Sequence, residues 1–316
     1  MFKYTIKRLL QSVVTVLIVV TIVFLLMRML PTDYFFTEDQ LMKFTPEQKE
    51  EQLQAAGLLD PMPEQLVRYY GQLLKFDFGE SRRIQNGVDV VSVIGDKFTI
   101  SMKLGCTALV ISLFLGILIG IIQTLNKDRI LDHVGTAYTI FVNAVPSLVS
   151  YSLVLAFGSK VLGLPSLYST RNPSETSILP IVCLSLASIA SYALWTRRYM
   201  VDELNKDYIK LARVKGTSSA GIMIKHVFKN AFVPLAQYVP ASFLYTIGGS
   251  LLVERFFSVP GMGPLLTDAI VRYDVNVVQT LVVLYAVLGT LGVFLGDILM
   301  MLLDPRIKLT GKGGTR

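Results

Sequence analysis

The sequence predicts an all-α polytopic membrane protein with six transmembrane helices, a small extracytoplasmic helical domain and a cytoplasmic helical hairpin. Of its 316 residues, 52% are hydrophobic and only 17% are charged, whereas soluble domains carry about 25% charged residues. The charges lie between six stretches of at least 19 residues without Asp, Glu, Lys or Arg, at 9–27, 104–125, 134–157, 176–196, 231–253 and 275–296. About 20 apolar residues cross a bilayer as a helix. A soluble all-α protein would have to bury six helices that lack a polar face, so the sequence favours the membrane.

The distribution of charge predicts how these helices are oriented. With the N-terminus inside and the sides alternating, the cytoplasmic pieces carry 17 Lys/Arg and 7 Asp/Glu, and the outer pieces carry 13 and 16. Lys and Arg are retained on the cytoplasmic side during insertion, so we expect both termini in the cytoplasm. The net charge of +7 is then an orientation signal, and no nucleic-acid partner is needed to explain it.

This topology divides the chain into four regions. Residues 1–30 form the cytoplasmic N-terminus and first helix, 31–100 an extracytoplasmic domain, 101–303 the membrane core and 304–316 a cytoplasmic tail. The basic N-terminus would also suit a secretory signal peptide, but the apolar run is too long and no small-x-small cleavage site follows it. We interpret it as a retained helix in the cell membrane.

Few side chains offer metal-binding or catalytic chemistry. Cys106 and Cys183 are the only cysteines and lie in hydrophobic stretches, and His133 and His226 are the only histidines. A disulfide framework, a metal site and His-based catalysis are therefore not expected. The sequence has no G-x-x-x-x-G-K-[ST] phosphate loop, so we expect no cofactor on this chain.

The extracytoplasmic domain is predicted to contain two helices. Thr45 is an N-cap, Pro46 occupies the first helical position and Gln48 completes a capping box. This helix should end at Gly57, and a second should begin near Pro63. The domain is either a docking surface for an extracytoplasmic partner or a cap over the helix ends.

The segment 197–230 is longer than a connection between antiparallel helices requires, and long ordered loops are usually functional. In its first predicted helix, one stripe is formed by Met200, Leu204, Tyr208, Leu211 and Ala212. Gly216 stands where a C-terminal cap belongs, and Thr217 or Ser218 can begin a second helix. The amphipathic hairpin either rests on the membrane surface or presents a small-residue corner to another protein.

The run 207–216, DYIKLARVKG, resembles the cytoplasmic "EAA" loop of ATP-binding-cassette (ABC) importer permeases. In that family an Ala is followed four residues later by a Gly, here Ala212 and Gly216. Lys210 and Leu211 stand where the generic pattern has Glu and Ala. The loop therefore resembles that of one branch of the family more than the generic family pattern.

That branch is the oligopeptide/dipeptide (peptide/nickel) transporter family, in its B-type permease. Its loop is similar to Tyr-Ile-x-x-Ala-Arg-x-Lys-Gly and continues to His-x-x-x-Asn-Ala, here His226 and Asn230. Further similar segments follow in order along the chain: 8–31, 57–61, 78–81, 257–263 and 303–306.

The resemblance implies that the hairpin couples the membrane helices to a separate ATPase. The residues implied in coupling are Asp207, Tyr208, Lys210, Leu211, Ala212, Arg213, Lys215 and Gly216. It also implies a second, related permease, two ATPase subunits that hold ATP and Mg, and an extracytoplasmic binding protein that delivers peptides. The alternative is a secondary transporter or channel driven by an ion gradient, which the uncharged helix centres disfavour.

Uncharged polar residues in the predicted helices are candidates for a translocation path: Asn143, Ser147, Ser150, Ser185, Ser188, Tyr192, Gln237, Tyr245, Thr246 and Gln279. Three of them, at positions 185, 188 and 192, share one helical face. Each could instead mediate helix packing, which is common for small polar residues in membranes.

The last outer loop is a candidate gate. It contains Phe257, Pro260, Gly261 and Gly263, and its prolines and glycines are expected to prevent a helix there. The loop either dips back toward the path or forms an ordinary turn. Irregular backbone inside a membrane is tolerated only where protein or water covers it, so a gate would have to face the cavity.

Overall fold

The computed structural model describes residues 2–303, apart from the side chains of residues 2–4, 38, 245 and 247. The helices are, in chain order, α1 (Phe2–Arg28), η1 (Thr32–Phe35), α2 (Glu38–Lys43), α3 (Pro46–Ala55), α4 (Met62–Leu74), α5 (Val90–Leu125), α6 (Ile130–Ala144), α7 (Ser147–Lys160), α8 (Pro173–Thr176), α9 (Ile178–Leu204), α10 (Asp207–Val214), α11 (Ser219–Ile222), η2 (Met223–Phe228), α12 (Lys229–Ile247), α13 (Leu251–Phe256), α14 (Met262–Val271) and α15 (Val275–Leu303). Two short strands, β1 (Glu80–Ser81) and β2 (Val88–Asp89), pair antiparallel. The tail 304–316, with most of the motif at 303–306, lies outside the described residues.

The helices support several membrane crossings. By length and composition, four can span a bilayer: Thr5–Arg28 of α1, α5, Pro173–Leu204 (α8 with α9) and α15. α6 and α7 qualify only as a pair, which brings the crossings in the described chain to five at most. α12 is not among them, although its 19 residues pack against α5, α9 and α15. The helical membrane class is thus supported, and the count of six stays a prediction.

The uncharged stretch 134–157 does not form one straight helix, because α6 and α7 meet at 113°. Pro146 causes this break, since proline has no N–H to donate and disfavours helical backbone at the residue before it. Val145 is accordingly extended, with φ −81° and ψ 129°, and Pro146 becomes the N-cap of α7. The prediction of a continuous third transmembrane helix is therefore wrong.

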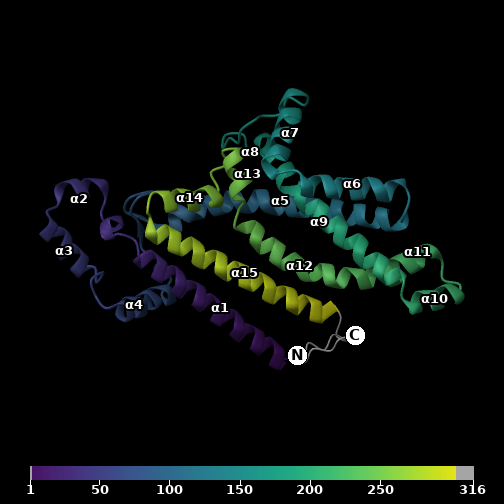
Figure 1. The fold of residues 1–316 in the computed structure, drawn as a ribbon, viewed down its shortest axis with the longest axis horizontal. Coiled ribbons are helices and arrows are strands. Elements are labelled where there is room, and N and C mark those ends of the chain that lie inside the picture. The colour runs from purple at the N-terminus through teal and green to yellow at the C-terminus, as the bar shows by residue number, and fades with distance from the viewer. Residues whose placement is uncertain (1, 304–316) are drawn as a thin grey trace.

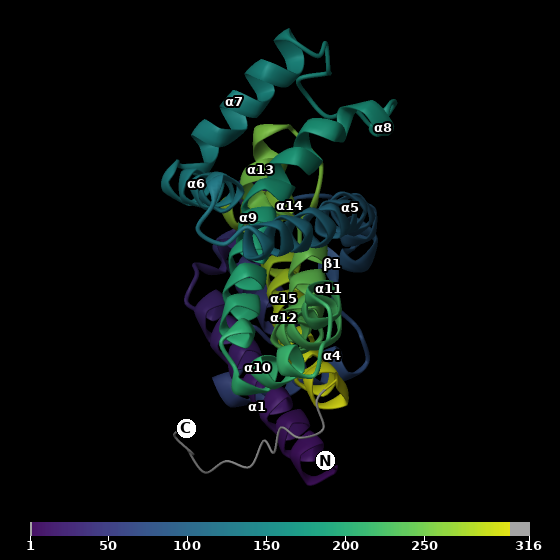
Figure 2. The same ribbon diagram turned by 90° about the vertical axis from the view of Figure 1, so that its right-hand side faces the viewer.

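The bundle is arranged around α5 and α9, which form its most extensive helix pair. α12 packs against both of them and against α15, and α1 packs on α15 at the edge. Figure 1 shows α10 and α11 at the same end as the start of α1 and the end of α15. The segment with α2, α3 and α4 lies at the opposite end, and α7 and α8 project beyond the bundle in both views (Figure 2).

Glycines bring the helices into close contact at two crossings. Gly116 and Gly120 of α5 face α9, where a methyl group at either position would lie 2.5 Å from a side-chain carbon. Gly292 and Gly296 of α15 face α12 in the same way, and a methyl group at Gly292 would lie 2.7 Å from the Cα of Ala241. Such small residues at one-turn spacing let membrane helices approach closely, and van der Waals contact then holds them together.

The predicted outer segment, residues 31–100, contains both predicted helices. The hydroxyl of Thr45 accepts the N–H of Gln48 at 3.4 Å, and the Gln48 side chain accepts the N–H of Thr45 at 3.0 Å, so the predicted capping box of α3 is confirmed. The chain leaves α3 through Gly57, whose φ of +66° favours glycine. α2 is an additional helix with its own capping box, from Thr37 to Gln40, which the same sequence signal would predict.

The outer segment is joined to the membrane helices rather than separate from them. Tyr70 of α4 donates its hydroxyl to the carbonyl of Leu17 in α1 at 3.1 Å, and Tyr69 stacks on Phe24 with ring centroids 5.2 Å apart. At its other end the segment runs without a break into α5, so the expected domain boundary at residue 100 falls inside a helix.

The buried carboxylate of Asp274 fastens the outer segment to the start of α15. One of its oxygens accepts the hydroxyl of Ser81 at 2.6 Å and the N–H groups of Arg82, Arg83 and Ile84 at 3.2, 2.9 and 2.9 Å. A buried carboxylate is costly unless it is hydrogen-bonded, and these four donors meet that requirement. The turn after β1 is therefore held by one side chain from the far end of the chain.

Removal of this carboxylate should release the turn. In Asp274→Ala, four donors lose their acceptor, and each buried group left unpaired costs about 1–3 kcal/mol. We expect the opening free energy of the amides at 82–84 to fall by about 3 kcal/mol or more, measured by hydrogen exchange. Asp268→Ala is the matched control, because Asp268 is partly exposed and pairs with Arg255. Equal protection of the turn in both variants would contradict the anchor.

Candidate functional site

A hairpin of α10, α11 and η2 connects α9 to α12. The predicted first helix runs from Met200 through Ala212, but α9 ends at Leu204 and α10 begins at Asp207. Lys206 between them is extended, with φ −74° and ψ 146°. The prediction of one helix is wrong because the apolar period continues across the break: both helices contribute to the same buried cluster.

The corner of the hairpin is a Schellman cap. Gly216 has a φ of +79°, and its N–H donates to the carbonyl of Arg213 at 3.0 Å. The N–H of Thr217 donates to the carbonyl of Ala212 at 3.1 Å, which completes the motif. Ser218 then caps α11 by accepting the N–H of Gly221 at 3.2 Å. The predicted cap at Gly216 is confirmed, and of the two candidate N-caps the structure uses Ser218.

The inner side of the hairpin is a packed apolar cluster that also includes the ends of α9 and α12. Its buried members are Met200, Ile209, Ala212, Ile222, Val227 and Ala231. Ala212 is only 9% exposed, so it packs against its own chain. It is therefore not available to a partner, contrary to the expectation from the sequence. Packing of this kind makes the hairpin one body with the helices that it joins.

The outer side of α10 leaves two large apolar side chains in solvent. Leu211 is 55% exposed and Val214 is 85% exposed. Beside them, Lys210 pairs with Asp207 at 2.8 Å, and this contact lowers the pKa of the Asp207 carboxyl. The sequence interpretation missed Val214, although its spacing of three and seven residues from Leu211 and Asp207 places all three on one face.

Tyr208 ties the two sides of the hairpin base together. Its hydroxyl bonds the carboxylate of Glu203 at the end of α9 and accepts the side-chain N–H of Asn230 in α12 at 2.8 Å. Burial, together with the bond to Glu203, raises the pKa of Tyr208. His226 lies next to it, with ring centroids 6.5 Å apart. The residues of the His-x-x-x-Asn motif thus hold the hairpin in place.

A buried ion pair braces α9 above the hairpin. The Arg197 guanidinium donates to both carboxylate oxygens of Asp132 in α6, at 2.5 and 2.6 Å. Asp132 also accepts the N–H of Asp128 at 3.0 Å, and it is 2% exposed. Two parallel N–H···O bonds fix orientation as well as distance, so α6 and α9 are linked rigidly at this level.

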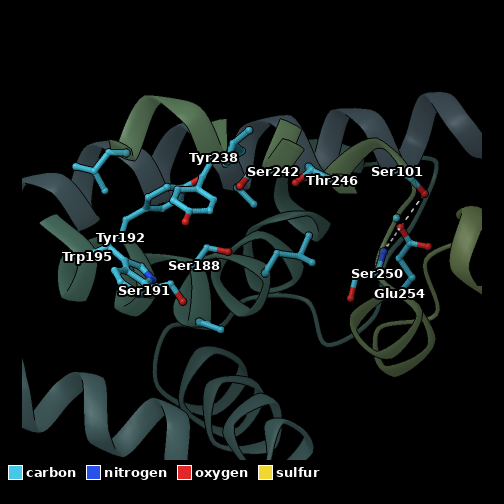
Figure 3. Close-up of a pocket in the computed structure, with 17 residues that line it drawn as sticks. Ser101, Ser188, Ser191, Tyr192, Trp195, Tyr238, Ser242, Thr246, Ser250 and Glu254 are labelled. Carbon is cyan, nitrogen blue, oxygen red and sulfur yellow. Dashed lines mark hydrogen bonds between the residues drawn. The ribbon is translucent and has the colours of Figure 1, made fainter. Parts of the chain in front are cut away.

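Between α5, α9 and α12 lies a cavity of about 500 Å³ (Figure 3). Its polar and aromatic lining residues are Ser101, Ser188, Ser191, Tyr192, Trp195, Tyr238, Ser242, Thr246, Ser250 and Glu254. Apolar residues of α5, α9 and α12, together with Gly249 in the turn after α12, complete the wall. Hydroxyl groups and rings supply hydrogen bonds and contact area without selecting for charge.

Of the predicted path residues, Ser188, Tyr192 and Thr246 line this cavity. Ser185 does not, because it is buried and donates to the carbonyls of Ile181 at 2.7 Å and Ala108 at 3.3 Å. It therefore packs α9 against α5, which is the alternative role that its residue type suggests.

The remaining predicted path residues are not part of the described lining. Asn143 and Ser147 are exposed on α6 and α7. Gln237 faces α15 and donates to Asp297 at 3.2 Å. The side chain of Tyr245 lies outside the described residues.

Several lining residues were missed by the sequence interpretation. Tyr238 and Ser242 lie eight and four residues before Thr246 on α12, and Ser191 and Trp195 lie at i+3 and i+7 from Ser188 on α9. Helical spacing of polar and aromatic side chains was the available signal.

Glu254 is the one acidic residue in the described lining, at the end of the cavity shown on the right of Figure 3. Its carboxylate accepts the Ser101 hydroxyl at 2.7 Å and the N–H groups of Gly263 at 2.9 Å and Ser250 at 3.3 Å. A methyl group at Gly261 would lie 2.5 Å from the Ser101 hydroxyl, so only glycine allows this approach. The carboxylate is a structural centre for the outer loop.

The outer loop contains a helix that the sequence interpretation excluded. α14 begins at Met262, and Gly263 and Pro264 occupy its first turn, where the missing N–H of proline leaves no hydrogen bond unmade. That prediction is wrong because proline is costly in the interior of a helix but is tolerated in its first turn. Phe257 is fully buried against α5 and α9 residues, and Pro260 leads into Gly261, the N-cap of α14.

A helical membrane bundle with a polar cavity between its helices and a packed hairpin at one end suits a transport permease. A family model described as "Binding-protein-dependent transport system inner membrane component" matches residues 113–309. The chain belongs to this family. It is a multi-pass membrane subunit that works with the other subunits of a transporter, and it is not an enzyme.

Relatives cover the chain almost completely. It is 32% identical to the dipeptide transport system permease protein DppB of Lactococcus lactis over 309 residues, 98% of this chain and 100% of the relative. It is 32% identical to DppB of Bacillus subtilis over 315 residues, 99% and 100% of the two chains. It is 31% identical to the oligopeptide transport system permease protein OppB of Salmonella typhimurium over 310 residues, 98% and 100%.

The buried brace between α6 and α9 can be tested by breaking it. Arg197→Met leaves the Asp132 carboxylate buried without its cation, and we expect a loss of about 3 kcal/mol, the low end for buried pairs because Arg197 is partly exposed. The double variant Asp132→Leu with Arg197→Met should recover most of this stability. Arg198→Met, at the exposed neighbour, is the control in thermal unfolding of the purified protein. Similar losses for Arg197→Met and Arg198→Met would refute the brace.

Proposed function

We propose that this chain is the permease subunit of an ABC importer for peptides and forms half of its translocation path. The relatives DppB and OppB carry dipeptide and oligopeptide transport in their names, which supports the substrate class. A path lined by hydroxyl groups and aromatic rings, with its one described carboxylate fully hydrogen-bonded, suits peptides of varied sequence. Selection then takes place on a binding protein outside.

The observation that carries the proposal is the solvent-exposed side of α10 in the hairpin. Leu211 and Val214 stay in solvent on a helix whose other side is fully packed. Exposed apolar side chains that are held rigidly and rimmed by charges are typical of a protein contact. We assign Leu211 and Val214 to a contact that enters a groove on an ATPase subunit. Asp207, Lys210 and Arg213 form the rim of this contact. Lys215 and Gly216 form the corner, Tyr208 holds the base of the hairpin through its hydroxyl, and Ala212 packs inside it.

The same helices join the hairpin to the cavity. α9 enters the hairpin and carries Ser188 and Tyr192, and α12 leaves it and carries Tyr238 and Ser242. A displacement of the packed hairpin therefore moves both walls of the cavity as rigid elements. In this way ATP and Mg, which are held by the ATPase subunits, drive the movement of the cavity walls, although this chain binds neither.

The assembly follows from this assignment. The N-terminus and hairpin face the cytoplasm, where two ATPase subunits bind, and the segment with α2–α4 faces outward with the binding protein. A second permease, related but not identical, completes the path. α12 is the fifth crossing and the α6–α7 pair the third, which makes six. The loop with Phe257, Pro260, Gly261 and Gly263 closes the outer end of the path around Glu254.

The hairpin contact is tested by Leu211→Asp and Val214→Asp. Each should insert in the membrane at the normal level but lose co-purification with the ATPase subunits, and peptide uptake should fall by about tenfold or more, since a buried charge in an apolar contact costs several kcal/mol. Leu167→Asp is the control, an equally exposed leucine in the loop before α8. Normal uptake by both hairpin variants would reject the contact, and uptake that follows an ion gradient without ATP would favour a secondary transporter.

The path is tested by filling the cavity. Ser188→Trp and Ser242→Trp place a large ring in a space of about 500 Å³, so peptide uptake should fall severalfold while the ATPase subunits remain bound. Asn143→Trp is the control, because Asn143 is exposed away from the described lining. The assignment fails if all three variants transport at the same rate.

A further inference from the structure

α4 of the outer segment reaches the middle of a transmembrane helix. The hydroxyl of Tyr70 donates to the carbonyl of Leu17 in α1 at 3.1 Å and bonds the hydroxyl of Thr21 at 2.5 Å. The neighbouring Tyr69 stacks on Phe24, which lies nearly one turn further along α1. These contacts place α4 beside the second half of α1 (Figure 1).

The depth of this contact follows from the length of the α1 span. The stretch 9–27 contains no charged residue, and at 1.5 Å per residue it is about 28 Å long. That length only just crosses a hydrocarbon core of about 30 Å, so residues 17–21 lie near the middle of the bilayer. Because Tyr70 reaches this level and Tyr69 reaches Phe24, α4 lies below the membrane surface.

α4 has an apolar stripe that the described chain does not cover. Val67 and Leu74 are 72% and 82% exposed, and with Gly71 between them they recur at helical spacing. The charged residues of the helix are on a different stripe, together with a glutamine: Glu64, Arg68, Gln72 and, at the C-cap, Lys75. Both stripes are exposed, so each meets a different surrounding.

The contacts of α4 show which stripe faces the bilayer. Tyr70, the side chain that reaches deepest, lies three residues after Val67 and four before Leu74, so it shares their side of the helix. On the polar stripe, Arg68 pairs with Asp60 at 2.5 Å and donates to the carbonyl of Ala56 at 3.3 Å. The polar stripe therefore faces the rest of the outer segment, and the apolar stripe faces the interior of the bilayer.

We propose that α4 is immersed in the adjacent leaflet of the membrane, with Val67 and Leu74 in contact with lipid hydrocarbon. A helix satisfies its own backbone inside a bilayer, and amphipathic helices rest with their apolar side among the acyl chains. The long side chain of Lys75 extends to the headgroups. The apolar stripe continues the lipid-facing surface of α1, on which Ile18 and Ile22 are about half exposed.

On this proposal the segment 31–100 is not wholly outside the membrane. α4 anchors it, so that α2 and α3 are held at the surface. The partner of the apolar stripe is lipid rather than the binding protein. The inference depends on depth relative to α1, so it holds for either orientation of the chain and does not involve the transported substrate.

The test measures the depth of α4 by electron paramagnetic resonance. Full-length protein with Cys106→Ala and Cys183→Ala receives one new cysteine, as Val67→Cys or Leu74→Cys. It is then labelled with a nitroxide and reconstituted in vesicles of phosphatidylethanolamine and phosphatidylglycerol. Oxygen concentrates in hydrocarbon, and a nickel chelate stays in water. At both positions we expect oxygen to relax the nitroxide severalfold more strongly than the chelate does.

Two further positions calibrate the measurement. Gln72→Cys is the matched control on the polar stripe of the same helix, where the side chain is exposed, and the chelate should dominate there. Ile22→Cys on α1 is the reference for a side chain in lipid, and oxygen should dominate there.

Each outcome decides the proposal. Dominance of oxygen at 67 and 74, with dominance of the chelate at 72, supports the immersed helix. Dominance of the chelate at all three positions overturns it and places α4 in water. Weak collisions with both reagents at 67 and 74 also overturn it, because a protein surface then covers the apolar stripe. If one variant fails to reconstitute, the other decides alone, since both positions lie on the same stripe.

Discussion

Every carboxylate buried in this bundle has to find donors, and that requirement determines where the helices are joined. A buried charge is costly in an apolar surrounding unless its partners are complete. Asp132 takes two bonds from Arg197 and so links α6 to α9. Glu254 gathers Ser101 and the backbone of the outer loop, and Asp274 gathers the turn after β1. Along their lengths the helices meet through apolar side chains, close glycine contacts and single hydrogen bonds such as that of Ser185, whereas these polar centres fix their ends.

The hairpin, α9 and α12 form a rigid connection, and the cavity between the helices has a largely uncharged lining. The hairpin is packed through its cluster of apolar residues, capped at Gly216 and clamped at its base by Tyr208. α9 and α12 leave it in different directions and become two walls of the cavity. Since neither wall carries a charge at its centre, movement of these helices opens and closes space without having to move a buried ion through lipid.

Local signals in the sequence predicted local structure well. The capping box at Thr45 and the cap at Gly216 depend on a few neighbouring residues, and both are present. The role of Glu254 could not be predicted, because its donor Ser101 lies 153 positions away in the chain. The break at Pro146 had a local signal, but a continuous uncharged stretch concealed it. Which polar residues face the cavity depends on how each helix is rotated, and rotation is set by the glycine contacts between helices.

The central claim is that the solvent-exposed side of α10 contacts a separate ATPase subunit. Site-directed cross-linking in the assembled transporter tests it most directly, with single cysteines introduced as Leu211→Cys and Val214→Cys and, at the far end, Leu167→Cys. The account predicts that both α10 positions cross-link to an ATPase subunit and that the cysteine at position 167 does not. Cross-links to that subunit from other parts of the chain, with none from α10, would contradict it.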